Sequence, residues 1–189
     1  MNNTRRKFLR DAGRFSMGLG ALTINPGLVK SMKRQISPNE KICLALIGAR
    51  GRGFRVLEQA LQQPETECRA ICDVDDTVIQ DRVAEVMELQ EVKPKIFKDY
   101  RKMLEDPEID AIIIGTPDHW HCLQLVHACE AGKDVYVEKP MANSLGELEV
   151  MVKAVRKYQR VVQVGQQQRS GRHWKMAIDF IKQGGIGQL

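Results

Sequence analysis

A glycine-rich segment, Gly48-Ala49-Arg50-Gly51-Arg52-Gly53, follows a short apolar run and has the residue types that hold a phosphate group. Glycines at such a turn let the first N–H groups of a following helix approach a pyrophosphate, and the helix dipole favours the negative charge. Aligned on the dinucleotide fingerprint GxGxxG, Gly48 and Gly53 match, whereas Arg50 stands in place of the middle glycine. We expect Gly51 to take over that close approach, with Arg50 or Arg52 supplying charge to the phosphates.

An acid in the right place strengthens this prediction. Asp73 lies 25 residues after Gly48, at the end of a second apolar run, where a carboxylate can accept hydrogen bonds from an adenosine ribose. Asp75 and Asp76 follow it and would repel a 2′-phosphate, which favours NAD over NADP. The alternative is that Asp73 is an ordinary turn or capping aspartate. In the context of a strand, a loop and a helix, the sequence predicts dinucleotide binding.

Three later segments also carry chemistry-bearing side chains: Gly115-Thr116-Pro117-Asp118-His119-Trp120-His121, Glu138-Lys139-Pro140 and Val164-Gly165-Gln166-Gln167-Gln168-Arg169-Ser170. An ammonium such as that of Lys139 can stabilise a developing alkoxide, and its pKa shifts readily on desolvation. Taken alone, Glu138 and Lys139 would favour the interpretation as an ordinary surface ion pair, and the flanking segments reverse that preference. We predict no metal site, because His119 and His121 do not face each other at a helix start and no further ligands complete a shell.

The elements that must position these segments alternate regularly along the chain. Short apolar runs predict strands, and longer segments with apolar positions at helical spacing predict helices. The alternation predicts parallel pairing through right-handed crossovers, hence an α/β fold of the Rossmann type with a doubly wound parallel sheet. The predicted strands are residues 42–47, 67–72, 95–97, 111–114, 135–137 and 161–164. The predicted helices are residues 54–62, 77–89, 100–105, one with Asp118 as candidate N-cap and Gly132 as candidate C-cap, one lined by Leu148, Met151, Val152 and Val155, and residues 172–183.

Composition and charge exclude several classes of protein. A hydrophobic content of 43% with 28% charged residues is typical of a globular chain of 189 residues. The net charge of +5 is confined to residues 1–36, which carry +7, so the remaining residues carry −2 and give no basic footprint for a nucleic acid. No apolar run approaches the length of a membrane span. The five cysteines form no CxxC pair and are odd in number, so we expect no disulfide framework.

The basic N-terminus resembles a twin-arginine export signal. Arg5-Arg6-Lys7-Phe8-Leu9 precedes a modest apolar run from Phe15 to Leu22, and the run is followed by Asn25-Pro26. We therefore expect residues 1–36 to be a signal-like segment read by the twin-arginine export machinery, which would make the protein periplasmic or exported. The alternatives are a disordered basic terminus and a cytoplasmic protein.

Together, the glycine loop and the three later segments resemble the N-terminal domain of the Gfo/Idh/MocA oxidoreductases, the glucose–fructose oxidoreductase and inositol dehydrogenase family, and in particular its exported subgroup. The resemblance covers about residues 40–189, and Glu138-Lys139-Pro140 is its most specific part. It implies an NAD-dependent oxidoreductase that acts on a hydroxyl of a sugar or cyclitol. The substitution of Arg50 for glycine departs from the family pattern.

The resemblance also implies roles for individual residues. Lys139 would be catalytic and contact the substrate oxygen at its junction with the nicotinamide, and Glu138 would orient Lys139 or contact the cofactor. Thr116, Pro117 and His121 would pack around the cofactor, and the peptide before Pro140 is often cis in the family. Gln167, Arg169 and His173 would face the cofactor or the substrate, with His173 on the substrate side, although Arg169 and His173 could be no more than a loop-to-helix boundary.

Family members continue into a second α/β domain, which usually covers the nicotinamide and makes the contacts of a homo-oligomer. We expect residues 37–189 to be the dinucleotide-binding domain, truncated at the entry to that second domain, and to bind NAD with little turnover alone. Two rival functions stay open. One is an NAD-assisted glycoside hydrolase, whose members usually lack lysine at the position of Lys139, and the other is a non-catalytic dinucleotide-binding fragment.

Overall fold

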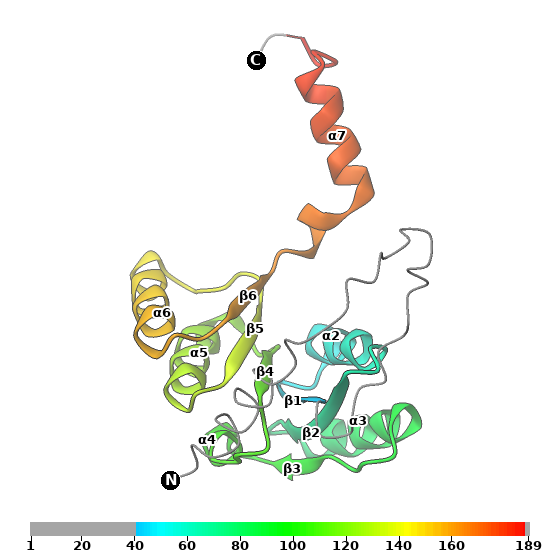
Figure 1. Cartoon of the computed structure of the whole chain (residues 1–189), viewed down its shortest axis with the longest axis vertical. Coiled ribbons are helices and arrows are strands. Elements are labelled where there is room, and N and C mark those ends of the chain that lie inside the picture. The colour runs from blue at the N-terminus through cyan, green and yellow to red at the C-terminus, as the bar shows by residue number, and fades with distance from the viewer. Residues whose placement is uncertain (1–40, 188–189) are drawn as a thin grey trace, which may run out of the picture. The chain divides into compact units, whose positions relative to one another are not determined.

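The computed structural model describes residues 41–187, and the predicted signal-like segment 1–36 lies outside these residues. Six parallel strands form one sheet in the order β3-β2-β1-β4-β5-β6, which confirms the predicted doubly wound topology. Helices flank the sheet (Figure 1). The strands are β1 (Ile42–Ile47), β2 (Thr66–Cys72), β3 (Lys95–Phe97), β4 (Ala111–Ile114), β5 (Asp134–Glu138) and β6 (Val162–Gly165). The helices are α2 (Gly51–Leu61), α3 (Asp76–Leu89), α4 (Tyr100–Leu104), α5 (His121–Glu130), α6 (Leu145–Tyr158) and α7 (Arg172–Lys182), with 3-10 turns η2 (Asp118–Trp120) and η3 (Gln167–Ser170).

The central strand β1 is apolar on both faces because each face packs on a different group of helices. Leu44 and Leu46 belong to the buried cluster that contains residues of α2 and α3. Ala45 and Ile47 belong to the cluster that contains residues of α4, α5 and α6. A strand covered on both sides has no polar face, which is why its sequence is a continuous apolar run rather than an alternating one.

Apart from shifts of one residue at the ends of several elements, three details differ from the sequence prediction. The helix α2 begins at Gly51, three residues before the predicted start at Phe54. Asp118 opens the 3-10 turn η2 and is not the N-cap of α5, which begins three residues later. On α6, Met151 and Ala154 are buried, whereas the predicted core residue Val152 is exposed, because the apolar stripe is wider than the surface that packs against α5.

The end of α5 follows the sequence prediction. Gly132 adopts a φ of +75°, a left-handed conformation that costs glycine little. Its N–H donates to the carbonyl of Cys129, and the N–H of Lys133 donates to the carbonyl of Ala128. This pair of hydrogen bonds is a Schellman motif, which ends the helix and turns the chain into β5.

The strand ends are level with one another at one edge of the sheet. Ile47 of β1 is in register with Cys72 of β2 and with Ile114 of β4, and Ile114 is in register with Val137 of β5. The chain order reverses between β1 and β4, so the loops that follow them diverge and leave a crevice, where open α/β sheets bind ligands. The residues that follow these strands are therefore brought together by topology alone.

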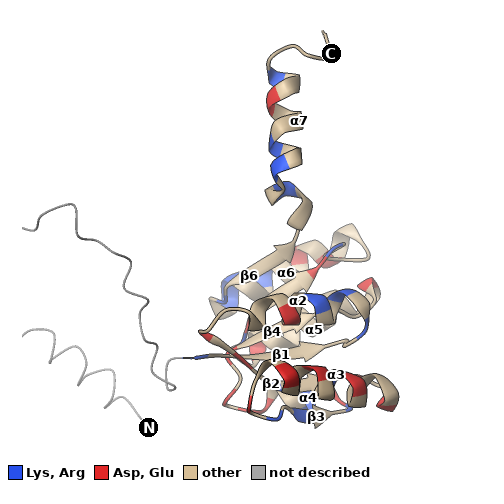
Figure 2. Cartoon of the chain, turned by 90° about the vertical axis from the view of Figure 1, so that its right-hand side faces the viewer, with Lys and Arg blue, Asp and Glu red and all other residues tan. Residues whose placement is uncertain are grey.

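Acidic and basic side chains are interspersed over the outer helices, and α3 carries several of the acidic ones (Figure 2). Within residues 41–187, no helix is both long enough and apolar enough to cross a membrane.

Candidate dinucleotide-binding site

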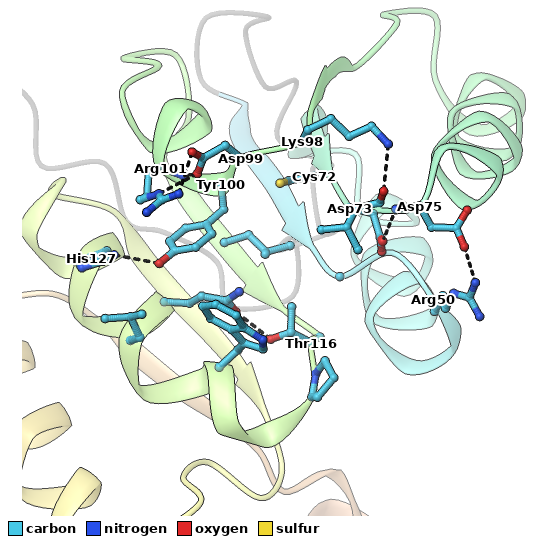
Figure 3. Close-up of a pocket in the computed structure, with 18 residues that line it drawn as sticks. Arg50, Cys72, Asp73, Asp75, Lys98, Asp99, Tyr100, Arg101, Thr116 and His127 are labelled. Carbon is cyan, nitrogen blue, oxygen red and sulfur yellow. Dashed lines mark hydrogen bonds and ion pairs between the residues drawn. The ribbon is translucent and has the colours of Figure 1, made fainter.

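A cleft of about 780 Å³ lies at the carboxyl edge of the sheet, over the ends of β1, β2 and β4 (Figure 3). Its walls come from four loops and from one face of α5. The lining residues are Ile47, Gly48 and Arg50 at and after the end of β1, residues 72–75 at and after the end of β2, residues 98–101 after β3, residues 115–117 after β4, and Trp120, Leu123, Gln124 and His127. The cleft thus occupies the crevice between β1 and β4 that the topology predicts.

The glycine loop is shaped by close backbone contacts. Gly48 has a φ of +83°, and a Cβ at this position would lie 2.7 Å from the backbone nitrogen of Thr116. A Cβ on Gly53 would overlap the carbonyl oxygen of Gly48 and lie 3.1 Å from Cα of Gly115. Both positions therefore require glycine, which lets the start of α2 press against the loop that follows β4. Gly51 has open space where a Cβ would stand, but its φ of +42° lies in the left-handed region that favours glycine.

The amino terminus of α2 fits a pyrophosphate. Its first turn holds no acidic side chain, and Arg50, which occupies the N-cap position, makes no side-chain capping hydrogen bond. The first N–H groups of the helix are therefore left without a capping partner from the N-cap side chain, and the helix dipole favours an anion at this end.

Asp73 connects the end of β2 to this loop. Its Oδ2 accepts a 2.7 Å hydrogen bond from the N–H of Ala49, and its Oδ1 accepts a 3.1 Å hydrogen bond from the N–H of Asp75. Each carboxylate oxygen can accept more than one hydrogen bond, so the group keeps acceptor capacity toward the cleft for ribose hydroxyls. This placement matches the ribose-binding acid of the dinucleotide fingerprint.

The cations around the cleft are each paired with an acid. Arg50 pairs with Asp75, Lys98 with Asp76 and Arg101 with Asp99. Figure 3 shows the guanidinium of Arg50 directed at the carboxylate of Asp75 rather than across the helix terminus. Among the described residues, none of these three cations is left unpaired for a 2′-phosphate, in keeping with the preference for NAD.

Asp75 is held ionised by its neighbours. Hydrogen bonds from the Thr77 hydroxyl and from Arg50 hold the pKa of the Asp75 carboxyl well below its usual range. The same carboxylate caps α3 by accepting from the N–H groups of Thr77 and Val78. Asp75 therefore engages Arg50, which we expected to supply charge to the phosphates.

Arg52 also engages a carboxylate, on the opposite side of the glycine loop. Its Nε donates a 3.0 Å hydrogen bond to Oε1 of Glu138, which is 4% exposed. The Tyr136 hydroxyl lies 3.3 Å from the same oxygen, and the N–H of Lys139 donates to Oε2 at 3.2 Å. Glu138 raises the pKa of the Arg52 guanidinium, chiefly through the hydrogen bond between them. Glu138 thus links the amino terminus of α2 to the backbone of Lys139, whose own side chain is exposed.

His121 is not on the cleft surface, where we expected it to pack around the cofactor. It is 1% exposed, with Nδ1 2.7 Å from the carbonyl oxygen of Pro140 and Nε2 2.8 Å from that of Thr116. The physical reason is that α5 begins with this residue, which turns its side chain inward beneath the two loops. Cys122 lies beside it with Sγ 3.7 Å from the carbonyl oxygen of Glu147. Within residues 41–187, no three His, Cys, Asp or Glu side chains converge as metal ligands would.

The remaining predicted residues divide into two groups. Thr116 and Pro117 line the cleft, and the Thr116 hydroxyl donates to Oε1 of Gln124 at 2.7 Å. The peptide before Pro140 is cis, as the family resemblance implied. The other group, Gln167, Arg169 and His173, lies on η3 and α7, where each residue is exposed and none lines the cleft. No residue of α7 is buried.

Sequence reasoning missed one wall of the cleft. The hydroxyl of Tyr100 lies 2.9 Å from Nδ1 of His127, and the two rings stack with centroids 5.9 Å apart. Tyr100 lies three residues after the end of β3, so its position at the carboxyl edge of the sheet was a signal for a cleft residue. His127 could not be found in this way, because it lies in the middle of a helix.

The sheet topology, the glycine loop against β4 and the acid at the end of β2 together define a dinucleotide-binding domain of the Rossmann class. A profile described as "Oxidoreductase family, NAD-binding Rossmann fold" matches residues 42–166. The chain belongs to this family, the Gfo/Idh/MocA oxidoreductases, and its cofactor is NAD.

Two curated relatives from Shewanella match the whole chain. A protein named glycosyl hydrolase family 109 protein 1, from Shewanella sp. strain ANA-3, is 30% identical. An alpha-N-acetylgalactosaminidase from Shewanella oneidensis is 29% identical. Each alignment covers 100% of this chain and 44% of the relative, so the chain spans less than half the length of these relatives.

Solved structures share the fold. A myo-inositol 2-dehydrogenase from Lactobacillus plantarum superposes with a TM-score of 0.69 at 23% identity, over 79% of this chain and 43% of the other. The WlbA dehydrogenase from Bordetella pertussis, in complex with NADH and UDP-GlcNAcA, superposes with a TM-score of 0.66 at 27% identity, over 76% of this chain and 42% of the other.

Proposed function

We propose that the protein transfers hydride between NAD and a secondary alcohol of a sugar or cyclitol, with Lys139 managing the proton of the reacting oxygen. The observation that carries the proposal is the fixed backbone of an exposed lysine at the carboxyl edge of the sheet. The Glu138 carboxylate accepts a hydrogen bond from the backbone N–H of Lys139. It accepts another from the side chain of Arg52, which lies on the helix that begins at the glycine loop. The lysine therefore belongs to the same edge as the NAD cleft. The dehydrogenase relatives of known structure support the class of reaction.

The chain's own groups divide the work. Bound NAD supplies the two-electron oxidant for the substrate carbon. The cleft holds the adenosine end through Asp73, and the uncapped first turn of α2 faces the pyrophosphate. As the carbon loses hydride, the amine form of the Lys139 side chain accepts the hydroxyl proton on Nζ and becomes an ammonium. In the reverse reduction the ammonium returns that proton to the oxygen.

Cofactor binding is tested on the 189-residue chain by calorimetric titration with NAD and then with NADP. We expect saturable binding of NAD and weaker binding of NADP. Asp73→Ala should lose most of the NAD affinity, whereas His119→Gln, on an exposed turn outside the cleft, should keep it. A circular dichroism melt of each variant separates a lost contact from a lost fold. Undiminished binding by a folded Asp73→Ala variant would refute the assignment of the ribose site.

Catalysis is tested on the protein at its full natural length, since 189 residues span 44% of the curated relatives. Sugars and cyclitols are screened for NADH formation, and Lys139→Ala is compared with Lys139→Arg. We expect Lys139→Ala to lower kcat by a factor of about 100 to 10,000, the range for loss of a general acid–base group, with NAD affinity retained. An unchanged kcat would exclude Lys139 as the proton-handling group.

A second candidate is glycoside hydrolysis through transient oxidation of the sugar, because the curated relatives that match the whole chain carry names of that activity. The lysine at position 139 argues for the dehydrogenase. The products distinguish the two functions: a dehydrogenase accumulates NADH with an oxidised sugar, whereas the hydrolase releases the aglycone of a nitrophenyl glycoside without net NADH. NAD binding with neither product would indicate a non-catalytic dinucleotide-binding module.

We also propose that residues 1–36 direct export through the twin-arginine pathway, as Arg5-Arg6 and the following apolar run indicate. A fusion of these residues to a fluorescent reporter is expected in the periplasm of wild-type cells and in the cytoplasm of cells that lack the translocase. Replacement of both arginines by lysine is the matched control, since it keeps the charge. Export of that variant would contradict the proposal.

A further inference from the structure

His121 makes a contact that the NAD site does not explain. The imidazole is 1% exposed and spans two loops, with the carbonyl oxygen of Pro140 2.7 Å from Nδ1 and the carbonyl oxygen of Thr116 2.8 Å from Nε2. Carbonyl oxygens only accept hydrogen bonds, so a ring nitrogen that bears a hydrogen donates to the carbonyl beside it. The rigid ring thus places one nitrogen against each of the two loops.

The two loops joined by this ring belong to different parts of the site. Thr116 follows β4 and lines the cleft, and its hydroxyl is fixed by Gln124 of α5. Pro140 follows β5 and is bonded directly to Lys139. The ring therefore sets the spacing between a wall of the NAD cleft and the turn that carries the lysine. Because His121 is the first residue of α5, that helix supports both loops from below.

The Lys139 turn is consequently held at two points on either side of the lysine. On the amino side, the carboxylate of Glu138 accepts the N–H of Lys139. On the carboxyl side, His121 holds the carbonyl of Pro140. The lysine side chain itself is exposed between these two supports. A side chain that must meet a substrate atom beside the cofactor gains from such a fixed base, since a displacement of about 1 Å can cost about a hundredfold in rate.

We propose that His121 is a positioning residue, which fixes the Lys139-Pro140 turn relative to the Thr116 loop without touching the cofactor or substrate. The inference rests on the proposed function, because it assigns His121 an effect only through Lys139. It replaces the expectation that this histidine packs around the cofactor. The proposal predicts an effect on turnover that is separate from NAD binding.

The test is a double-mutant cycle in the protein at its full natural length, with His121→Gln, Lys139→Ala and the combined variant. Glutamine can donate to one of the two carbonyls but cannot span both. We expect His121→Gln to lower kcat by about 10- to 100-fold and to leave the Kd for NAD within about twofold. The combined variant should be no slower than Lys139→Ala alone, because His121 has nothing to position once the Lys139 side chain is removed.

His119→Gln is the matched control. It changes a histidine two residues earlier, which is exposed and pairs only loosely with Asp118 at 3.8 Å, and it should leave kcat unchanged. His121→Phe keeps the ring volume without either donor and should reproduce the loss of kcat if it folds. Melting curves and NAD titrations of each variant show that the fold is retained.

The outcomes distinguish failure of the positioning role of His121 from failure of the proposed function of Lys139. A full loss of kcat in Lys139→Ala with none in His121→Gln overturns the positioning role alone. A combined variant that is slower than Lys139→Ala by the whole His121→Gln factor also overturns it, since the histidine would then act independently of the lysine. Unchanged kcat in Lys139→Ala overturns the proposed function of Lys139 and the inference together.

Discussion

Replacing Arg52 by methionine removes the cation from a nearly buried carboxylate. The Glu138 side chain is 5% exposed, and Arg52 is its only ion-pair partner among the described residues. Methionine keeps most of the aliphatic length of arginine, so the packing of α2 is disturbed little. The remaining neighbours, the Tyr136 hydroxyl and the Lys139 N–H, donate hydrogen bonds but carry no charge at neutral pH.

The expected cost follows from the burial of the two partners. Removing one partner of a fully buried ion pair destabilises a protein by about 3–5 kcal/mol. The Arg52 side chain is 38% exposed, so water reaches the carboxylate once the guanidinium is gone and reduces this cost to about 2 kcal/mol. For a domain of this size, such a change lowers the melting temperature by about 4–8 °C.

Urea unfolding at 25 °C, followed by far-ultraviolet circular dichroism, measures the cost. Arg50→Met is the matched control, because it removes a neighbouring guanidinium from Asp75 in an exposed pair and should leave the stability nearly unchanged. In the background of Glu138→Gln, the Arg52→Met change should cost at least about 1 kcal/mol less than in the wild type, because the amide carries no charge.

Two results would refute this reasoning. One is an Arg52→Met variant no less stable than Arg50→Met, and the other is strict additivity with Glu138→Gln. The pattern would then favour the role that the sequence alone suggested for Arg52, in which its charge serves the phosphates. That role predicts a large loss of NAD affinity with unchanged stability, and a titration with NAD measures it directly.

Three further predictions follow from other contacts. Gly48→Ala should lower the free energy of unfolding by about 1–3 kcal/mol, because φ is +83° and the new Cβ would lie 2.7 Å from the Thr116 nitrogen. The same variant should bind NAD more weakly in a titration, and full NAD affinity would contradict the role of the loop. Lys133→Met should lower the free energy of unfolding by about 1–3 kcal/mol, since the Lys133 ammonium donates to two backbone carbonyls at 2.7 and 2.8 Å. Urea unfolding measures this loss, and an unchanged midpoint would mean that water replaces the ammonium. The pKa of Asp75 is lower in the folded protein than in the unfolded chain, so its stabilising effect is complete well above pH 3.8 and declines as the pH falls toward the folded pKa. The difference in melting temperature between wild type and Asp75→Asn should therefore shrink below pH 3.8. A difference that stays constant with pH would contradict this prediction.

The sequence predicted the sheet well because its central strands are buried on both faces. Residues 42–47 and 111–114 were located to the residue, since short continuous apolar runs that end in glycine have few other interpretations. Residues 95–97 were also located to the residue, although this edge strand starts with Lys95 and is largely exposed. The start of α2 was placed late because Gly51 and Gly53 have low helix propensity, and Gly53 fits there only through its close contact with the backbones of Gly48 and Gly115. Tertiary packing overrides local preference at that point.

The cleft was predictable in part for the same reason. Gly48, Asp73 and Thr116 follow strands that the sequence located, so their meeting at one edge needed only the topology. The partners of Arg50 and Arg52 were not predictable, because the sequence does not say which of several nearby acids a flexible guanidinium will reach. In the structure the two arginines are drawn to opposite sides of the loop, toward Asp75 and Glu138.

The three residues of the Glu138-Lys139-Pro140 motif have different surroundings in the structure. Glu138 is buried and its carboxylate faces inward, Lys139 is exposed, and Pro140 presents its carbonyl to His121. One residue of the three is therefore free to meet a substrate, while the other two receive supports from α2 and α5. If Arg52 and His121 act as argued, a change at either residue would alter the lysine without touching the cleft. Sequence likeness at the motif then predicts activity only where the residues at both supporting positions are also kept.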